Sequence, residues 1–155
     1  MFLFTNFENM PLSASKSKVC FFFQDTRPSL SNRSPLKEFI LSILRKEDKK
    51  PGTINFIFCT DKAILEINRQ FLEHDFYTDI ITFDLSEDRY VTAEIYISIE
   101  RVKDNAAKLG VSFKSELHRV IFHGILHLCG YKDKSHKESQ KMRAKEDFYL
   151  SRYFG

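Results

Sequence analysis

Residues 123–133 read His123-Gly-Ile-Leu-His127-Leu-Cys-Gly130-Tyr-Lys-Asp133, the most informative stretch of this 155-residue chain. Two histidines four positions apart on a helix share one face, so His123 and His127 can direct ring nitrogens at one ion, about 2.0–2.1 Å from each. Gly130 can adopt the left-handed conformation that ends a helix and turns the chain back. Asp133 is the first residue after this turn that readily binds a metal. The stretch therefore predicts a metal site of His123, His127 and Asp133.

Plainer interpretations of these residues exist. A single histidine on an apolar helix face is usually a hydrogen-bonded core residue, and Gly130 with Asp133 could simply stop the helix. The conjunction of two histidines, a helix-ending glycine and a carboxylate is more specific than any of its parts and favours the metal. His136 is a rival third ligand, but it follows Ser135, the expected N-cap of another helix, which sets its direction.

Gly124 follows the first histidine and bears on both chemistry and packing. In zinc peptidases with paired helical histidines this position is a glutamate that acts as the base, so Gly124 disfavours a peptidase. A glycine inside a helix costs about 1 kcal/mol relative to alanine. We expect the close approach of another backbone segment or of substrate to offset this cost.

Hydrophobic periodicity and capping residues place the stretch within a larger pattern. Pro51-Gly52 is expected to form a turn, and Ser135 with Glu138 forms a capping-box pair. The expected strands are 19–24, 53–59, 80–84 and 94–99. The expected helices begin near Ser34, after Thr60, at Glu100, after Ser112 and after Ser135.

Four strands and about five helices predict a mixed sheet in a single α/β or α+β domain, with the metal site on a helix. The length suits one core. Residues 1–18 lack sustained periodicity and are expected to form a flexible leader, with Met10 as a possible true start. Residues 19–155 are expected to form the domain.

Composition restricts cellular context more than activity. The formal net charge of +3 permits a nucleic-acid partner without arguing strongly for one. Three cysteines without paired spacing do not form a disulfide framework, so we expect no disulfide partner and a reducing compartment. No apolar run approaches the roughly 18 residues of a membrane span. A soluble, cytoplasmic protein with no membrane partner is expected.

Residues 123–133 are also similar to the HGxLHLxGYDH signature of the YbeY family, the single-strand-specific endoribonucleases of bacterial rRNA maturation. The similarity extends to the segment from Asn68 through Asp75 and to residues 78–83. It also includes the predicted strand that begins at Glu94 and the part of the helix, from Glu116 onward, that leads to His123. Glu138, Met142 and Glu146 fit the family's tail. The resemblance covers roughly residues 53–150.

This resemblance implies an α+β fold with one zinc ion per chain. It also implies a role in ribosome quality control and in maturing the 3′ end of the small-subunit RNA. Single-stranded RNA, rRNA and the small ribosomal subunit are then the expected partners. His123 and His127 match the family's first two ligands. Asp133 stands where the family has its third histidine, with Lys132 in place of the preceding aspartate.

A second departure is Leu72, which replaces a family arginine after the aromatic of the Asn-x-x-Tyr segment. An arginine near a scissile phosphate would stabilise developing charge. Its absence weakens the expected activity or moves that role to Lys132, Lys134 or Arg69. No residue is identified as the base. Asp75 and Asp79 lie in the loop that the resemblance places near the cleft, and either could equally be a turn residue.

Residues that could contact RNA occur both before and after the predicted metal-binding stretch. Phe76 and Tyr77 could stack on unpaired bases or could anchor their loop. A group of basic residues could follow the phosphate backbone, or form a solvated helix face. These residues are Lys132, Lys134, Lys137, Lys141, Arg143 and Lys145.

The sequence therefore leads to three hypotheses about function. The first hypothesis is a zinc-dependent endoribonuclease acting on single-stranded RNA. The second is a non-catalytic, ribosome-associated assembly factor that keeps zinc for stability, which the missing arginine at Leu72 motivates. The third is a metallopeptidase, which Gly124 disfavours. Chelator-sensitive cutting of RNA but not of casein would distinguish the first hypothesis from the other two.

Overall fold

The computed structural model describes residues 17–155 as four strands and five helices in one α+β domain, which confirms the predicted fold class. In chain order, the elements are β1 (Lys18–Phe23), α1 (Arg33–Lys46), β2 (Lys50–Cys59), α2 (Asp61–Leu72), β3 (Ile80–Asp84), β4 (Tyr90–Ser98), α3 (Ile99–Leu109), α4 (Phe113–Leu128) and α5 (His136–Phe154).

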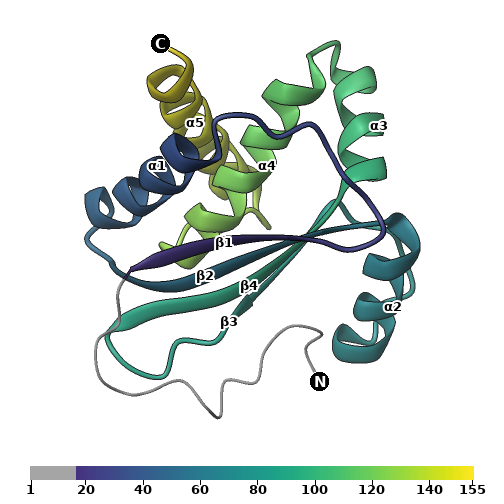
Figure 1. Cartoon of the computed structure of the whole chain (residues 1–155), viewed down its shortest axis with the longest axis horizontal. Helices are drawn as coiled ribbons and strands as arrows, with labels where there is room; N and C mark the ends of the chain where they lie inside the picture. The colour runs from purple at the N-terminus through teal and green to yellow at the C-terminus, as the bar shows by residue number, and fades with distance from the viewer. Residues whose placement is uncertain (1–16) are drawn as a thin grey trace.

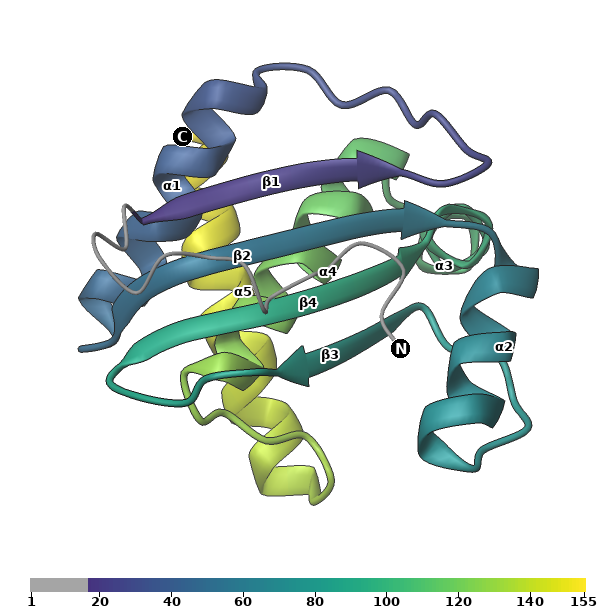
Figure 2. The ribbon, with the colours of Figure 1, turned by 60° about the horizontal axis from the view of Figure 1, so that its bottom comes forward.

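The sheet is mixed, with strand order β1-β2-β4-β3. β1, β2 and β4 run parallel, and β3 pairs antiparallel with β4, from Ile80 opposite Ile97 to Asp84 opposite Ala93. Helices α1, α4 and α5 cover one face of the sheet, whereas α2 lies at the end of the sheet next to the start of β3 (Figures 1 and 2). There Ile64 and Ile67 of α2 form a second, smaller core cluster with residues of β2, β3 and β4. The fold therefore places α4 between the sheet and α5.

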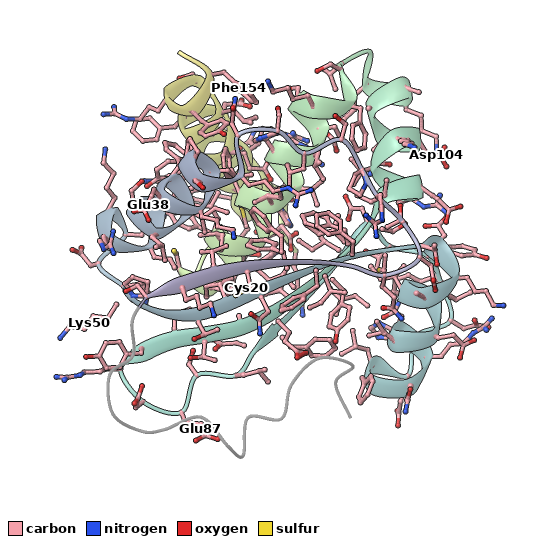
Figure 3. All side chains as sticks on the ribbon, viewed as in Figure 1. Cys20, Glu38, Lys50, Glu87, Asp104 and Phe154 are labelled. Carbon is pink, nitrogen blue, oxygen red and sulfur yellow. The ribbon has the colours of Figure 1, made fainter. Side chains whose placement is uncertain are left out.

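Helix α4 is buried on most of its circumference because it packs against β3 and β4 on one side and α1, α3 and α5 on the others. Leu117, Ile121, Ile125 and Leu126 are fully buried in the main core. Glu38 on α1 and Asp104 on α3, by contrast, are exposed on the outer surfaces of their helices (Figure 3). A helix fixed on this many sides holds its side chains rigidly, which favours a site that requires defined geometry.

Gly124 lies on the side of α4 that packs against the sheet. A Cβ at this position would lie 2.9 Å from Cδ1 of Ile80 and 3.3 Å from Cγ2 of Ile95. The close approach predicted for Gly124 is therefore present, and it comes from side chains of the sheet rather than from another backbone segment. The glycine lets the histidine-bearing turn of α4 settle onto β3 and β4.

Predicted helix caps are largely confirmed. The side chains of Thr60 and Ser112 accept hydrogen bonds from backbone amides of α2 and α4, and Ser135 forms the predicted capping box with Glu138. Helix α1 begins at Arg33, one residue from the predicted entry near Ser34, and its N-cap Asn32 makes no side-chain capping hydrogen bond.

Pro51-Gly52 does not form the predicted turn. Both residues lie inside β2, where the pairing with β4 shifts register between Pro51 and Ile54. A Cβ on Gly52 would lie 2.8 Å from the carbonyl oxygen of Val91, so the glycine is needed for close backbone approach. The same pairing starts β4 at Tyr90, four residues before the predicted strand.

The leader predicted for residues 1–18 lies almost entirely outside the described residues. Of its last two residues, Ser17 donates through Oγ to the carbonyl of Pro51, and Lys18 begins β1. The three cysteines carry free thiols. None of the helices among residues 17–155 has the length and apolar character needed to cross a membrane.

Candidate metal centre

His123 and His127 converge as their spacing on α4 predicts. Their Nε2 atoms lie 3.0 Å apart, and Oδ2 of Asp133 lies 3.3 Å from each. Within residues 17–155, these three residues form a group whose possible ligand atoms all lie within 4.8 Å of one another. His136 is not a member of this group and lies exposed at the first turn of α5. Two imidazoles and one carboxylate form a donor set that suits zinc.

The turn that returns Asp133 to the helix begins at Gly130, whose φ is 99°. The amide of Gly130 donates to the carbonyl of His127, and the amide of Tyr131 donates to the carbonyl of Leu126. Ser139 on α5 donates through Oγ to the backbone carbonyl of Asp133 at 2.8 Å. The loop is therefore attached to both flanking helices, with the carboxylate between them.

Each histidine has its Nδ1 occupied, which leaves Nε2 to face the shared position. Nδ1 of His127 lies 2.9 Å from the backbone oxygen of Tyr131. Nδ1 of His123 lies 2.6 Å from Oε1 of Glu146. Such outer partners orient metal-binding imidazoles and fix their tautomer. The two histidines are therefore arranged for binding through Nε2 before any metal arrives.

A buried network of charges extends behind His123. Arg119 binds both carboxylate oxygens of Glu116 and also lies 3.3 Å from Oε1 of Glu146. Asp79 lies 3.9 Å from the same guanidinium. The Glu116 and Glu146 side chains are only 1% and 2% exposed. Three carboxylates thus surround Arg119, and Glu146 lies 3.3 Å from a second guanidinium, that of Arg143.

The pKa values of Glu146 and Asp79 are shifted in opposite directions. Burial alone would raise the pKa of Glu146, but the hydrogen bond with His123 and the charge of Arg119 lower it below its ordinary value. Burial raises the pKa of Asp79, against the opposing effects of Arg119 and His123. Glu146 is therefore held as an anion, whereas Asp79 is more easily protonated.

The two candidate bases occupy different environments. Asp75 is exposed and binds Nε of Arg69 at 2.5 Å, which also leaves Arg69 engaged on the surface. Asp79 lies within the electrostatic reach of His123 and accepts a hydrogen bond from Asn105 at 3.2 Å. Of the two aspartates, Asp79 is the one adjacent to the candidate metal centre.

Glu116, Arg119 and Glu146 received no role from sequence reasoning, although all three lie in segments that carried the resemblance. Positions 116, 119, 123 and 127 follow one another at helical spacings of three and four, so they form one polar stripe on α4. A charged stripe leading to a histidine pair is the signal that could have predicted the network. The contribution of Glu146 required knowing how α5 packs on α4.

The residues considered for RNA contacts are mostly exposed. Phe76 and Tyr77 are exposed by 56% and 53%, and Asn68 holds their loop by donating to the carbonyl of Phe76. Leu72 is 40% exposed at the end of α2. Most of the basic group is exposed, but Arg143 lies 3.3 Å from Glu146 and Lys145 binds Glu47.

Comparison with known proteins gives consistent matches. The family model described as Endoribonuclease YbeY matches residues 24–154. Endoribonuclease YbeY of Cytophaga hutchinsonii is 50% identical over 138 residues, covering 88% of this chain and 96% of the relative. Endoribonuclease YbeY of Flavobacterium johnsoniae is 45% identical over 126 residues, covering 81% and 91% of the two chains.

A solved structure matches as well. The solution structure of TM1509 from Thermotoga maritima is similar with a TM-score of 0.61 and 32% sequence identity, over 89% of this chain and 90% of that chain. The family match spans both helices of the site and the loop between them, so it includes all three residues of the candidate metal centre.

Proposed function

The chain belongs to the Endoribonuclease YbeY family, and from this premise we propose that it is a zinc-dependent endoribonuclease that cuts single-stranded RNA. Its substrate is rRNA, its reaction matures the 3′ end of the small-subunit RNA and serves ribosome quality control, and its partner is the small ribosomal subunit in the cytoplasm. The observation that carries the metal dependence is the convergence of His123, His127 and Asp133, with both Nδ1 atoms already engaged.

The proposed ligands are His123, His127 and Asp133, which would hold one zinc ion per chain. Zinc in such a site supplies a Lewis acid that activates water and polarises a phosphate oxygen. Glu146 fixes the orientation of His123, and the carbonyl of Tyr131 fixes that of His127. The protein's own contribution is therefore a preorganised and partly buried set of donors.

Asp79 is the proposed proton acceptor. It is adjacent to the His123 network and its side chain is 24% exposed, so water can reach it. Asp75 is the weaker candidate because it is bound to Arg69 on the surface. Arg119 is fully engaged by carboxylates, so we assign it to holding Glu146 and Asp79 rather than to contacting phosphate.

The RNA strand is proposed to lie across the loop of Phe76 and Tyr77 and the exposed basic residues of the 132–145 segment. Exposed aromatic rings can stack on unpaired bases of any sequence. Basic side chains bind phosphates with release of counterions, so RNA affinity falls as salt rises. Lys132 and Lys134 flank Asp133 directly and are the first cations that a bound phosphate would meet.

The test is incubation of the pure protein with a single-stranded RNA and, separately, with casein, each with and without a chelator. We expect the RNA alone to be cut, and the cutting to stop with chelator and return with added zinc. The matched variants are His127→Ala, which removes a ligand, and His136→Ala, which removes a nearby imidazole outside the group. RNA cutting that persists at full rate in chelator, or in His127→Ala, would contradict the proposal.

A specific observation keeps the assembly-factor hypothesis as the second candidate. The family resemblance implies that Leu72 replaces an arginine, and Arg69, one of its possible substitutes, is already bound to Asp75 and Glu66. In that case the protein would bind the small subunit tightly, in a zinc-dependent manner, without cutting RNA. Binding without turnover under conditions that load the zinc site would favour the second candidate over the first.

A further inference from the structure

Glu47, at the C-terminal end of α1, accepts three hydrogen bonds from the region around the metal centre. Its donors are the hydroxyl of Tyr131 at 2.8 Å, Nζ of Lys145 at 2.9 Å and the hydroxyl of Tyr149 at 2.5 Å. The Glu47 side chain is only 12% exposed. Glu47 is thus a nearly buried acceptor far in sequence from all three of its partners.

Tyr131 links Glu47 to the candidate ligands. Its hydroxyl donates to Glu47, while its backbone carbonyl meets Nδ1 of His127 at 2.9 Å. Asp133 follows two residues later in the same loop. The position of this one tyrosine therefore affects both the orientation of His127 and the return of Asp133 to the helix.

The side chain of Tyr131 also packs against the main core, and the charge of Lys145 acts on its hydroxyl. Its contacts with cations come from Lys141 and Lys145, whose Nζ atoms lie 5.7 and 5.5 Å from the ring centroid. A cavity of about 300 Å³ adjoins the loop, lined by Glu47, Tyr131 and Lys141 among others. Beside this open space, the hydrogen bond of 2.8 Å to Glu47 ties the Tyr131 hydroxyl to the end of α1.

We propose that Glu47 is a positioning residue for the metal centre, acting through Tyr131 on His127 and Asp133. The inference rests on the proposed metal-binding function. The competing explanation is that Glu47 only fastens α5 to α1 through Lys145 and Tyr149. The two explanations differ in a measurable way, because only the first couples Glu47 to metal affinity.

Two tyrosines provide a matched pair of variants for the test. Tyr131→Phe and Tyr149→Phe each remove one hydroxyl that donates to Glu47, but only Tyr131 belongs to the metal-binding loop. Zinc affinity of the full chain is measured by competition with a chelator, and unfolding of the metal-free chain is measured alongside. We expect Tyr131→Phe to weaken zinc binding about threefold to tenfold, the effect of losing one hydrogen bond. Tyr149→Phe should leave zinc affinity unchanged even where it lowers stability.

Glu47→Ala should weaken zinc binding to a similar extent, and adding Tyr131→Phe to it should cause no further loss, because both changes remove the same contact. Equal zinc affinity in Tyr131→Phe, Tyr149→Phe and the wild type would overturn the inference.

A metal-free readout separates this inference from the proposed function. Hydrogen exchange of the Gly130 and Tyr131 amides, which donate to His127 and Leu126, reports the loop alone. We expect faster exchange in Tyr131→Phe than in Tyr149→Phe. A wild type that binds no zinc would contradict the proposed function, and the exchange rates would then decide the inference. Equal rates in the two variants would overturn it.

Discussion

His123 and His127 lie one turn apart on α4, yet their Nδ1 atoms meet different kinds of partner. His123 faces Glu146, a buried carboxylate held by Arg119 inside the packing of α4 and α5. His127 faces a backbone carbonyl in the loop that also carries Asp133. The comparison separates the site into a charged half set by helix packing and a loop half set by turn geometry. Substitutions in the two halves should therefore reduce zinc affinity to different extents.

The largest effect is expected in the loop half, at the third ligand. Asp133→Ala should lower zinc affinity by about 100-fold or more, since one of three protein donors is lost. His136→Ala should barely change it, because His136 lies outside the group. Chelator competition measures both. A large loss in His136→Ala with little in Asp133→Ala would reverse the assignment.

A second substitution at position 133 tests how the charge of the third ligand affects the activity. Asp133→His replaces an anionic donor by a neutral one, which leaves the ion more electron-poor. Zinc binding should be restored relative to Asp133→Ala, and the activity optimum should move to lower pH. A pH profile with an unchanged or higher optimum would show that the charge of the third ligand does not control activity.

The charged half should show a smaller loss of affinity. Glu146→Gln keeps the shape of the side chain but removes the charge that orients His123, and loss of such an outer partner typically costs about 10–100-fold in metal affinity. Asp147→Asn is the matched control, because Asp147 is the exposed neighbour on the same helix. Zinc affinity in Glu146→Gln equal to that of the control would show that the buried network does not support the metal.

The smallest effect concerns a third histidine on α4. His118 is 2% exposed, and its Nδ1 meets the carbonyl of Lys114 at 2.7 Å. Burial lowers the pKa of His118 below its ordinary value of 6.5. The unfolded chain therefore takes up this proton first as pH falls, so the free energy of unfolding decreases below about pH 6.5 until the folded pKa is reached.

The test is the free energy of unfolding of the metal-free chain between pH 8 and 5. We expect His118→Phe to reduce the loss of stability on the acid side relative to the wild type, because the titrating group is gone. Phenylalanine keeps an aromatic ring at this position, next to Tyr153 and the other aromatic neighbours of His118. If the free energy of unfolding falls equally steeply with decreasing pH in the variant and the wild type, His118 does not cause the loss of stability. The metal centre, by contrast, should be little affected by this variant.

Sequence reasoning was most successful where local signals agree. The histidine spacing, the glycine after the helix and the carboxylate three residues later all lie within residues 123–133, and the structure brings their ligand atoms together. The caps at Ser112 and Ser135 bound the two helices of the site for the same reason. Short-range geometry alone determines these features.

Tertiary packing accounts for what sequence reasoning missed. Glu146 lies 23 residues after His123, and nothing local relates them until α5 packs on α4. Asp75 and Asp79 share one aperiodic segment, and only the fold makes one exposed and the other adjacent to Arg119. Pro51-Gly52 looks like a turn by composition, but strand pairing with β4 overrides that preference.

The most direct test of the metal centre is the zinc content of protein purified without added metal. The convergence of His123, His127 and Asp133 predicts about one zinc ion per chain by elemental analysis, removable by chelator and restored by zinc. A content well under about half an equivalent, unchanged after soaking in zinc, would contradict the metal centre.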